Sequence, residues 1–452
     1  MTRAPLPAGP PPLLACPTLN EGGFGAALGR LTEPTGPALR PVTLAGGLRA
    51  WATTDAVVSR AVLTDPRLTN DVREVGRPVQ GFPLRRYPED FFAHAPQLLS
   101  ASGDRHRRMR RIVAPFFTAA AAAGTAARLR CEVAQIIRSL AGRDRVDIVA
   151  DLALPLAGAT VGEVLGVPRE RRRSTVTAAL AASAAAPGTE AARSAQRAFS
   201  RAVLQIIGTA RHSSAPTAAT ALLHANRTGE LTNAEMAGML GMLLIGTIDS
   251  LATVIPAGTL LAMRRPDVRR GLSHGHDLSH GHGRYLSHGL SHGHGRYLSH
   301  GLSHGTEYTR ALTEEILRLN PSFQHTGWRF TRESCAIAGT SLPQGTVVVA
   351  SLLSANLDPT AWPDPLRADP HRRAPSSHLS FGHGPHYCLG AALGRRLVHD
   401  ALTGLFSRLP RLNPAAPAHE LIWHGVCLRR LNQLPVDTHT SARTGRPRPT
   451  GT

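Results

Sequence analysis

The sequence predicts a mainly α-helical fold with a small β-rich part, and three observations support this. Helical hydrophobic patterns extend over three long stretches, 105–140, 232–270 and 389–409. Patterns typical of strands are confined to three short stretches, 41–58, 335–349 and 421–436. The chain has 452 residues, of which 42% are apolar and 18% charged, so it can bury a large core.

The N-terminal half is predicted to hold a leader, a strand pair and several helices. Residues 1–20 are rich in Pro and Ala and indicate a flexible leader, without the basic start and apolar run of a signal peptide. Residues 66–100 combine Pro, Gly and aromatic residues, which favours a long loop. The other expected elements are a strand pair with a short helix over 41–58, and helices over 105–140, over 150–165 (ending at Gly166 and Pro168) and over 170–212 (broken near Pro187 and Gly188).

The strongest helical signal begins at Thr232, which can cap a helix and form a capping box with Glu235. The following run GMLLIGTIDSLATVI is apolar nearly all round, so this helix is expected to be buried in the middle of the molecule. Pro256 predicts a kink or an early break, with a further helix to about Arg270.

Residues 271–305 differ in kind from the rest of the chain. The unit GRYLSHGLSHGH (283–294) recurs at 295–305, and nine of the 22 His lie in this segment. Gly and Ser at this density cannot pack a core, which predicts a dispensable low-complexity insertion. Its HGH spacing can ligate Ni²⁺, Cu²⁺ or Zn²⁺, so a metal-binding or storage protein is one alternative; a solvent-exposed loop expanded by duplication is the other.

The C-terminal part predicts a helix over 308–319 that ends before Pro321, and two strands around a Pro343-Gln344-Gly345 turn within 335–349. A Pro-rich stretch and a Gly-rich loop precede the helix at 389–409. A final hairpin is expected over 421–436, and a disordered tail over 441–452.

The charge balance is strongly positive, since 51 Lys and Arg against 31 Asp and Glu give +20, and every basic residue is Arg. A coding bias toward GC-rich codons and a docking surface for an acidic partner both explain this. No basic cluster interleaved with aromatics appears, so nucleic-acid binding is not expected. Five irregularly spaced Cys argue against disulfides and for a reducing compartment. No run of apolar residues is long enough for a membrane anchor, and the protein is expected to be cytoplasmic.

The segment FGHGPHYCLG (381–390) places Cys388 at the end of a glycine-bearing loop, directly before a helical pattern. Unpaired N–H groups and the positive end of the helix dipole favour a thiolate there. Such a thiolate suits a haem iron, because it donates electron density and favours O–O cleavage. Small Gly382, Gly384 and Gly390 would let the backbone approach a flat macrocycle.

This segment resembles the haem-binding signature of the cytochrome P450 family, F-x-x-G-x-H-x-C-x-G. Phe381, Gly384, His386, Cys388 and Gly390 match it position by position. The resemblance implies haem b (iron-protoporphyrin IX) between the central helix and the Cys loop, with Cys388 as the iron ligand. It further implies one P450 domain over 21–440, interrupted by the insertion at 271–305.

Other motifs of the family follow in order. Glu315 and Arg318 match Glu-x-x-Arg on a helix, where the two side chains can pair. The resemblance makes Arg367 their later partner, although Ala368 stands where the family usually has Phe. Asn356-Leu-Asp-Pro359 resembles the run that precedes this loop. The family holds the haem propionates with cations, and the matching positions here are His106, Arg110, Arg329 and His386.

The family places its oxygen-side chemistry on the central helix, where this chain has Gly246-Thr247-Ile248-Asp249-Ser250-Leu251. Asp249 and Ser250 are therefore the candidate catalytic residues, relaying protons through water. Ser250 and Thr247 are the expected hydroxyl partners of Asp249. The chain departs from the family in having Ser250 for Thr and Thr247 for Gly, and a register shifted by one puts Asp249 at the alcohol position.

The resemblance implies a monomeric monooxygenase that hydroxylates or epoxidises a small organic substrate, with secondary metabolism as the expected setting. Electrons would come from a separate ferredoxin and ferredoxin reductase. By analogy, 70–100, 170–212 and the hairpin near Trp423 and Cys427 would shape the substrate pocket. The altered central-helix motif leaves open oxidative coupling without oxygen insertion.

Overall fold

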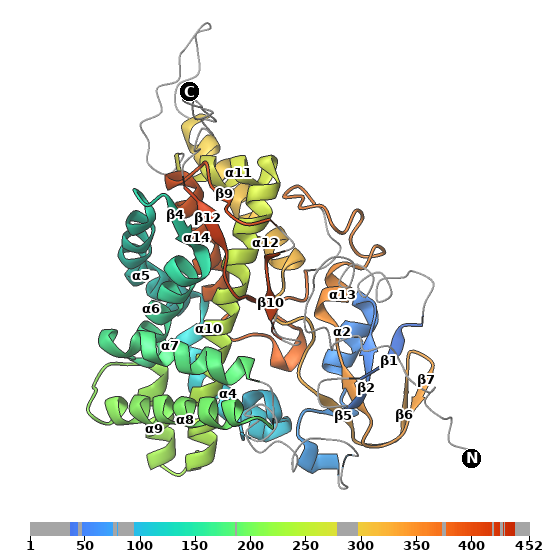
Figure 1. Cartoon of the computed structure of the whole chain (residues 1–452). Coiled ribbons are helices and arrows are strands. Elements are labelled where there is room, and N and C mark those ends of the chain that lie inside the picture. The colour runs from blue at the N-terminus through green and yellow to red at the C-terminus, as the bar shows by residue number, and fades with distance from the viewer. Residues whose placement is uncertain are drawn as a thin grey trace, which may run out of the picture.

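The computed structural model describes residues 37–43, 48–75, 79, 95–185, 188–277, 297–372, 377–417, 420–424, 428 and 430–438. Helices α5 to α10 gather on one side of the molecule, and strands β1, β2, β5, β6 and β7 lie on the other (Figure 1). The mainly α-helical fold with a small β-rich part is confirmed. The expected leader at 1–20 and tail at 441–452 lie outside the described residues.

The largest sheet has five short strands in the order β1-β2-β8-β5-β3. Its strands are β1 (Leu39–Thr43), β2 (Arg49–Thr53), β3 (Leu68–Thr69), β5 (Arg329–Thr331) and β8 (Val347–Val349). All neighbours run antiparallel except β2 and β8. The strand pair expected over 41–58 is thus present, and α2 (Ala56–Thr64) follows it with Asp55 as N-cap.

The helix expected over 105–140 is two helices, α4 (Gly103–Val113) and α5 (Ala119–Leu140). Pro115 lies in the 3-10 turn η5 (Ala114–Phe117) that separates them, since proline cannot continue the hydrogen-bond ladder. The π-turn η6 (Ile148–Ala153) leads into α6 (Leu154–Leu165), which ends at Gly166 in the left-handed conformation as predicted. The helix expected over 170–212 is indeed broken, into α7 (Arg169–Ala184) and α8 (Glu190–Arg211).

After α9 (Ala218–Arg227), the central helix α10 (Asn233–Arg264) forms the predicted capping box between Thr232 and Glu235. The expected early break at Pro256 is wrong, because α10 continues to Arg264. Two described segments, Ile148–Leu165 and Asn233–Arg264, have the length and apolar composition of a membrane span. Of the most apolar 18-residue stretch in each segment, however, 67% and 83% is buried within the protein. Their apolar surface therefore forms the core, as expected for a helix that is apolar all round.

The insertion is shorter than expected, because helices α11 (Pro266–Asp277) and α12 (Tyr297–Leu319) enter it from both ends. Leu272 is fully buried, and Ser273 donates a hydrogen bond to the Phe406 carbonyl of α14 (Ala391–Arg408). These residues thus belong to the core, contrary to the prediction for 271–305. The repeats between 278 and 296 lie outside the described residues.

The turn predicted at Pro343-Gln344-Gly345 is present between β7 (Thr340–Leu342) and β8, with the Thr346 amide donating to the Pro343 carbonyl at 3.2 Å. The strands on its two sides belong to different sheets, since β7 pairs with β6 (Cys335–Ile337) across Ala338 and Gly339, both at positive φ. The expected final hairpin is present as β10 (Trp423–His424) and β11 (Arg430–Leu431). The remaining sheet joins β4 (Arg145–Asp147), β12 (Pro435–Asp437) and β9 (Asn413–Pro414), and the short helix α13 (Leu352–Asn356) follows β8.

Candidate functional site

The Cys388 loop lies directly before α14 and has the backbone that its glycines predict. The amide of Cys388 donates to the Phe381 carbonyl at 2.9 Å, and Gly390 is the N-cap of α14. Gly384 has φ +69°, and a Cβ there would lie 2.6 Å from Thr64 Cγ2 and 3.1 Å from the Leu63 carbonyl oxygen. Only glycine therefore fits at this position, where η7 (Gly384–His386) crosses α2.

The environment of the Cys388 thiol differs from expectation in one respect. Burial raises its pKa above the ordinary value, against the lowering effects of the Gly390 amide, Arg110 and Arg395. The Gly390 amide and the two arginines are the groups that would favour a thiolate at Cys388 once a haem iron binds it, because a metal ligand must lose its proton.

The four residues expected to hold anions lie together, although they come from three separate segments: His106 and Arg110 from α4, Arg329 from β5, and His386 from the Cys loop itself. The rings of His106 and His386 are 4.2 Å apart, centroid to centroid, and Arg110 donates to the Tyr387 carbonyl at 2.8 Å. Burial, followed by the charges of Arg110, Arg107 and Arg329, lowers the pKa of His106 to about 4. Burial likewise lowers the pKa of Arg329 to about 10, and that of His386 well below its usual value.

Three of these residues carry buried nitrogens without a hydrogen-bond partner among the described residues: His106 Nε2, His386 Nδ1 and Arg329 Nε. Unpaired buried donors and mutually unfavourable positive charges are costly unless an anion joins them. The set therefore fits the two propionates of haem b, with Cys388 available to the iron. Sequence reasoning missed Asn70, which accepts from Arg329 Nη1 at 2.9 Å and orients that side chain.

Arg318 of α12 is fully buried, with none of its surface exposed. It makes a two-bond pair with Glu315, at 2.8 and 2.9 Å, and donates to three backbone carbonyls, those of Asn356, Pro365 and Arg367. The predicted partnership with the Arg367 side chain is wrong. Arg372 takes that place, with Nε 3.1 Å from Glu315 Oε2, because the loop turns the side chain of Arg367 outward and that of Arg372 inward.

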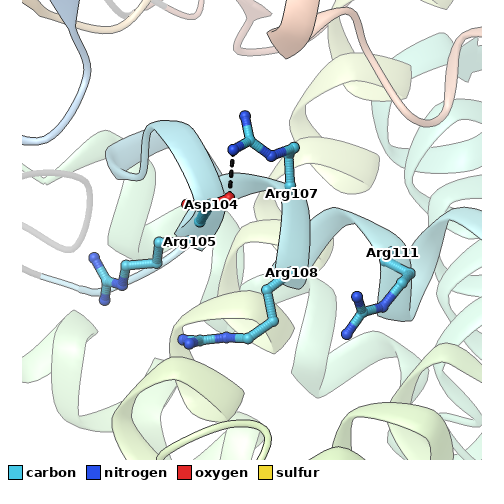
Figure 2. Close-up of a pocket in the computed structure, with 5 residues that line it drawn as sticks. All are labelled: Asp104, Arg105, Arg107, Arg108 and Arg111. Atoms are coloured by element: carbon cyan, nitrogen blue, oxygen red, sulfur yellow. Dashed lines mark hydrogen bonds and ion pairs between the residues drawn. The ribbon is translucent and has the colours of Figure 1, made fainter.

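The two faces of the basic helix α4 contact different parts of the protein. His106 and Arg110 turn toward the Cys loop, whereas other arginines line a hollow of about 620 Å³ with Asp104 (Figure 2). Arg105 and Arg108 both bond Glu235 of the α10 capping box, at 2.9 and 2.8 Å. These arginines tie α4 to the start of α10.

The middle of α10 is buried from Gly238 to Leu260 except at three residues, Gly246, Thr247 and Ser250. Asp249 points elsewhere and is 1% exposed, so the expected bonds to Ser250 and Thr247 are absent. Its Oδ1 lies 2.5 Å from Nη1 of Arg430 in β11. Burial raises the pKa of Asp249, while Arg430 and Ser183 oppose that shift.

Arg430 was not predictable, since nothing in its neighbourhood in the sequence separates it from the other arginines. Its guanidinium also donates to Ser183 Oγ at 3.2 Å and to the Leu180 carbonyl at 3.3 Å, both in the last turn of α7. A cation is favoured at a helix C-terminus, and Asp249 neutralises it from the other side. The ion pair therefore joins α7, α10 and the C-terminal hairpin.

Metal-ligand clusters of three or more His, Cys, Asp or Glu do not occur in the described part of the chain. The three cysteines described there, Cys131, Cys335 and Cys388, are free.

Comparisons with known proteins agree with this geometry. The family profile described as Cytochrome P450 matches residues 192–410. Nocardicin C N-oxygenase from Nocardia uniformis subsp. tsuyamanensis is 31% identical over 410 residues, covering 88% of this chain and 92% of that protein. Mycinamicin IV hydroxylase/epoxidase from Micromonospora griseorubida is 29% identical, covering 90% and 92%. The solved structure of CYP154A1 from Streptomyces coelicolor A3(2) superposes with a TM-score of 0.78 at 26% identity, covering 94% of this chain and 99% of that one.

Proposed function

Because the chain belongs to the cytochrome P450 family, and is a haem b monooxygenase as its relatives are, we propose that it hydroxylates or epoxidises a small organic substrate in secondary metabolism. The observation that carries the proposal is the convergence of His106, Arg110, Arg329 and His386 beside the Cys388 loop. These four residues would hold the propionates, and Cys388 would ligate the iron. Haem with a thiolate ligand supplies the activation of O₂ with two electrons and two protons.

Ser250 and Asp249 are the residues we propose for proton delivery. Gly246, Thr247 and Ser250 form a partly accessible strip on the otherwise buried middle of α10. Ser250 lies on this accessible strip, where its hydroxyl can hold water. Asp249 has one oxygen paired with Arg430 and a second, Oδ2, that is buried without a partner among the described residues. Proton transfer through Asp249 thus requires water to reach Oδ2 or the contact with Arg430 to open.

We expect Ser250→Ala to bind substrate and accept electrons normally but to form less product per electron pair, because the water that relays protons is no longer held. Asp249→Asn should slow turnover by about 10²–10⁴-fold, the usual contribution of a general acid. Both are measured as product, hydrogen peroxide and donor consumed in the same reaction. If both variants match the wild type, proton delivery bypasses these residues, and oxidative coupling without oxygen insertion becomes the better assignment.

The electron donor that we propose is an acidic ferredoxin with its reductase, docking on the Cys side. A groove of about 290 Å³ between α5, α12 and α14 is lined by Arg310, Arg395 and Arg396. Arg395 bonds the hydroxyl of Tyr387, at 3.0 Å, and Tyr387 is 38% exposed next to Cys388. Glu314 also lines the groove and pairs with Arg395, so three arginines against one carboxylate leave a net positive lining, which favours an acidic partner.

Electron transfer from such a ferredoxin should fall steadily as ionic strength rises, since salt screens the attraction between exposed charges. Arg310→Glu with Arg396→Glu should lower the association rate about tenfold at low salt. Arg201→Glu, an exposed position of α8, is the matched charge control and should have little effect. A rate that is flat or rises with salt, measured by stopped-flow reduction, would contradict docking at this groove.

We also propose that the protein is a cytoplasmic monomer whose P450 domain extends over 21–440. The continuous core from α4 to β12 supports a single domain. The burial of two long apolar helical segments supports their place in the core of the protein.

A further inference from the structure

The accessible strip of α10 holds one hydroxyl that the family pattern does not supply. Gly246, Thr247 and Ser250 lie within about 100° of each other around the helix, at 3.6 residues per turn. A Cβ at Gly246 would meet nothing within 4 Å, so the helix faces open space there. The family resemblance implies that the haem lies between the central helix and the Cys loop, and Gly246, Thr247 and Ser250 are the only residues of α10 between Gly238 and Leu260 that are not buried, so we assign this strip to the side of α10 that faces a ligand on the iron.

The two hydroxyls of the strip are free to act. Serine and threonine inside helices commonly donate to the carbonyl one turn back. Thr259 of the same helix does so, to the Ile255 carbonyl at 2.9 Å. The side-chain hydroxyls of Thr247 and Ser250 make no hydrogen bond to any residue that the structure describes. Their donors are thus available to a ligand or to water.

Asp249 is on the flank of this strip and is turned into the protein, where Arg430 holds it. The second polar group beside Ser250 is therefore Thr247 and not Asp249. Thr247 stands where the family usually has glycine, so its side chain adds both a hydroxyl and volume in front of the helix.

Resting on the proposed haem function, we infer that Thr247 is a further catalytic residue: its hydroxyl donates a hydrogen bond to the ligand held by the iron, beside Ser250. Thr247 gives up its own proton only as it takes another from Ser250 or from water, so the hydroxyl ends each turnover neutral. This hydrogen bond would add to the proton delivery proposed for Ser250 and Asp249 and would not replace it.

The test uses the infrared C–O stretch of the reduced protein with carbon monoxide. A donor near the oxygen of carbon monoxide lowers this frequency by drawing electron density toward it. Thr247→Val, which keeps the shape but lacks the hydroxyl, should raise the frequency, whereas Thr247→Ser should stay near the wild type. Thr259→Val is the control on the same helix and should change nothing. Thr247→Val should also lower product formed per electron pair about tenfold, below the full 10²–10⁴-fold effect because Ser250 remains.

The frequency should also shift in D₂O in the wild type, and less so in Thr247→Ala, which provides a second readout if the valine variant folds poorly. An unchanged frequency and unchanged coupling in both Thr247→Val and Thr247→Ala would overturn the inference. A wild type without the thiolate-type Soret band would instead overturn the proposed haem ligation, so the two failures are distinguishable.

Discussion

Replacing Cys388 with serine should abolish the red-shifted Soret band of the reduced protein treated with carbon monoxide, together with all turnover. The band requires a thiolate on the iron, and serine supplies an oxygen ligand of similar size that donates far less electron density. Cys388 is the only one of the three described cysteines in the loop that contacts His106 and Arg110. The change is measured by difference spectroscopy on purified, haem-loaded protein.

Two controls separate ligation from folding. Cys131→Ser and Cys335→Ser remove free thiols elsewhere in the described structure and should leave the band intact. The Cys388→Ser protein should retain its helical circular dichroism, because the loop backbone is held by the Phe381 carbonyl and the α14 cap. A haem-loaded wild type with only a histidine-type spectrum would contradict the assignment of Cys388.

The second large effect is expected from Arg318→Met, which should lower the free energy of unfolding by about 3–5 kcal/mol, the usual cost of removing one partner from a buried ion pair. The substitution leaves Glu315 with only Arg372 and the Asp369 amide, and it removes the donor from three backbone carbonyls. That loss is a large part of a typical stability of about 5–15 kcal/mol, so haem incorporation should fall as well. Urea denaturation with a haem-content assay measures both.

Two neighbouring arginines test which of them completes this network. Arg372→Met should destabilise the protein clearly, since Arg372 bonds Glu315 and its side chain is 8% exposed. Arg367→Met should stay within about 0.5 kcal/mol, because its exposed side chain makes no contact with Glu315 in the structure. The reverse order of effects would restore the assignment of Arg367 that the family resemblance suggested.

Several features were predictable because they depend on residues that are close in the sequence. The capping box needs only Thr232 and Glu235, and the left-handed end of α6 needs only Gly166. The break between α4 and α5 was also readable in principle, since Pro115 was there to signal it. The boundaries of the repeat segment were harder, because Leu272 becomes a core residue only when α11 packs on α14.

By itself, the sequence determined the fold class and the position of the Cys388 loop before a helix, because helical periodicity and a contiguous motif act through local geometry. His106, Arg110, Arg329 and His386 followed only from the family resemblance. Only the tertiary structure decided which groups meet across the chain. Asp249 and Arg430 are 181 residues apart, and Glu315 and Arg372 are 57 apart. In a chain with 51 basic residues, each carboxylate has many possible partners. A buried carboxylate pairs with the arginine that packing brings within hydrogen-bond distance, since leaving it unpaired in the core is too costly.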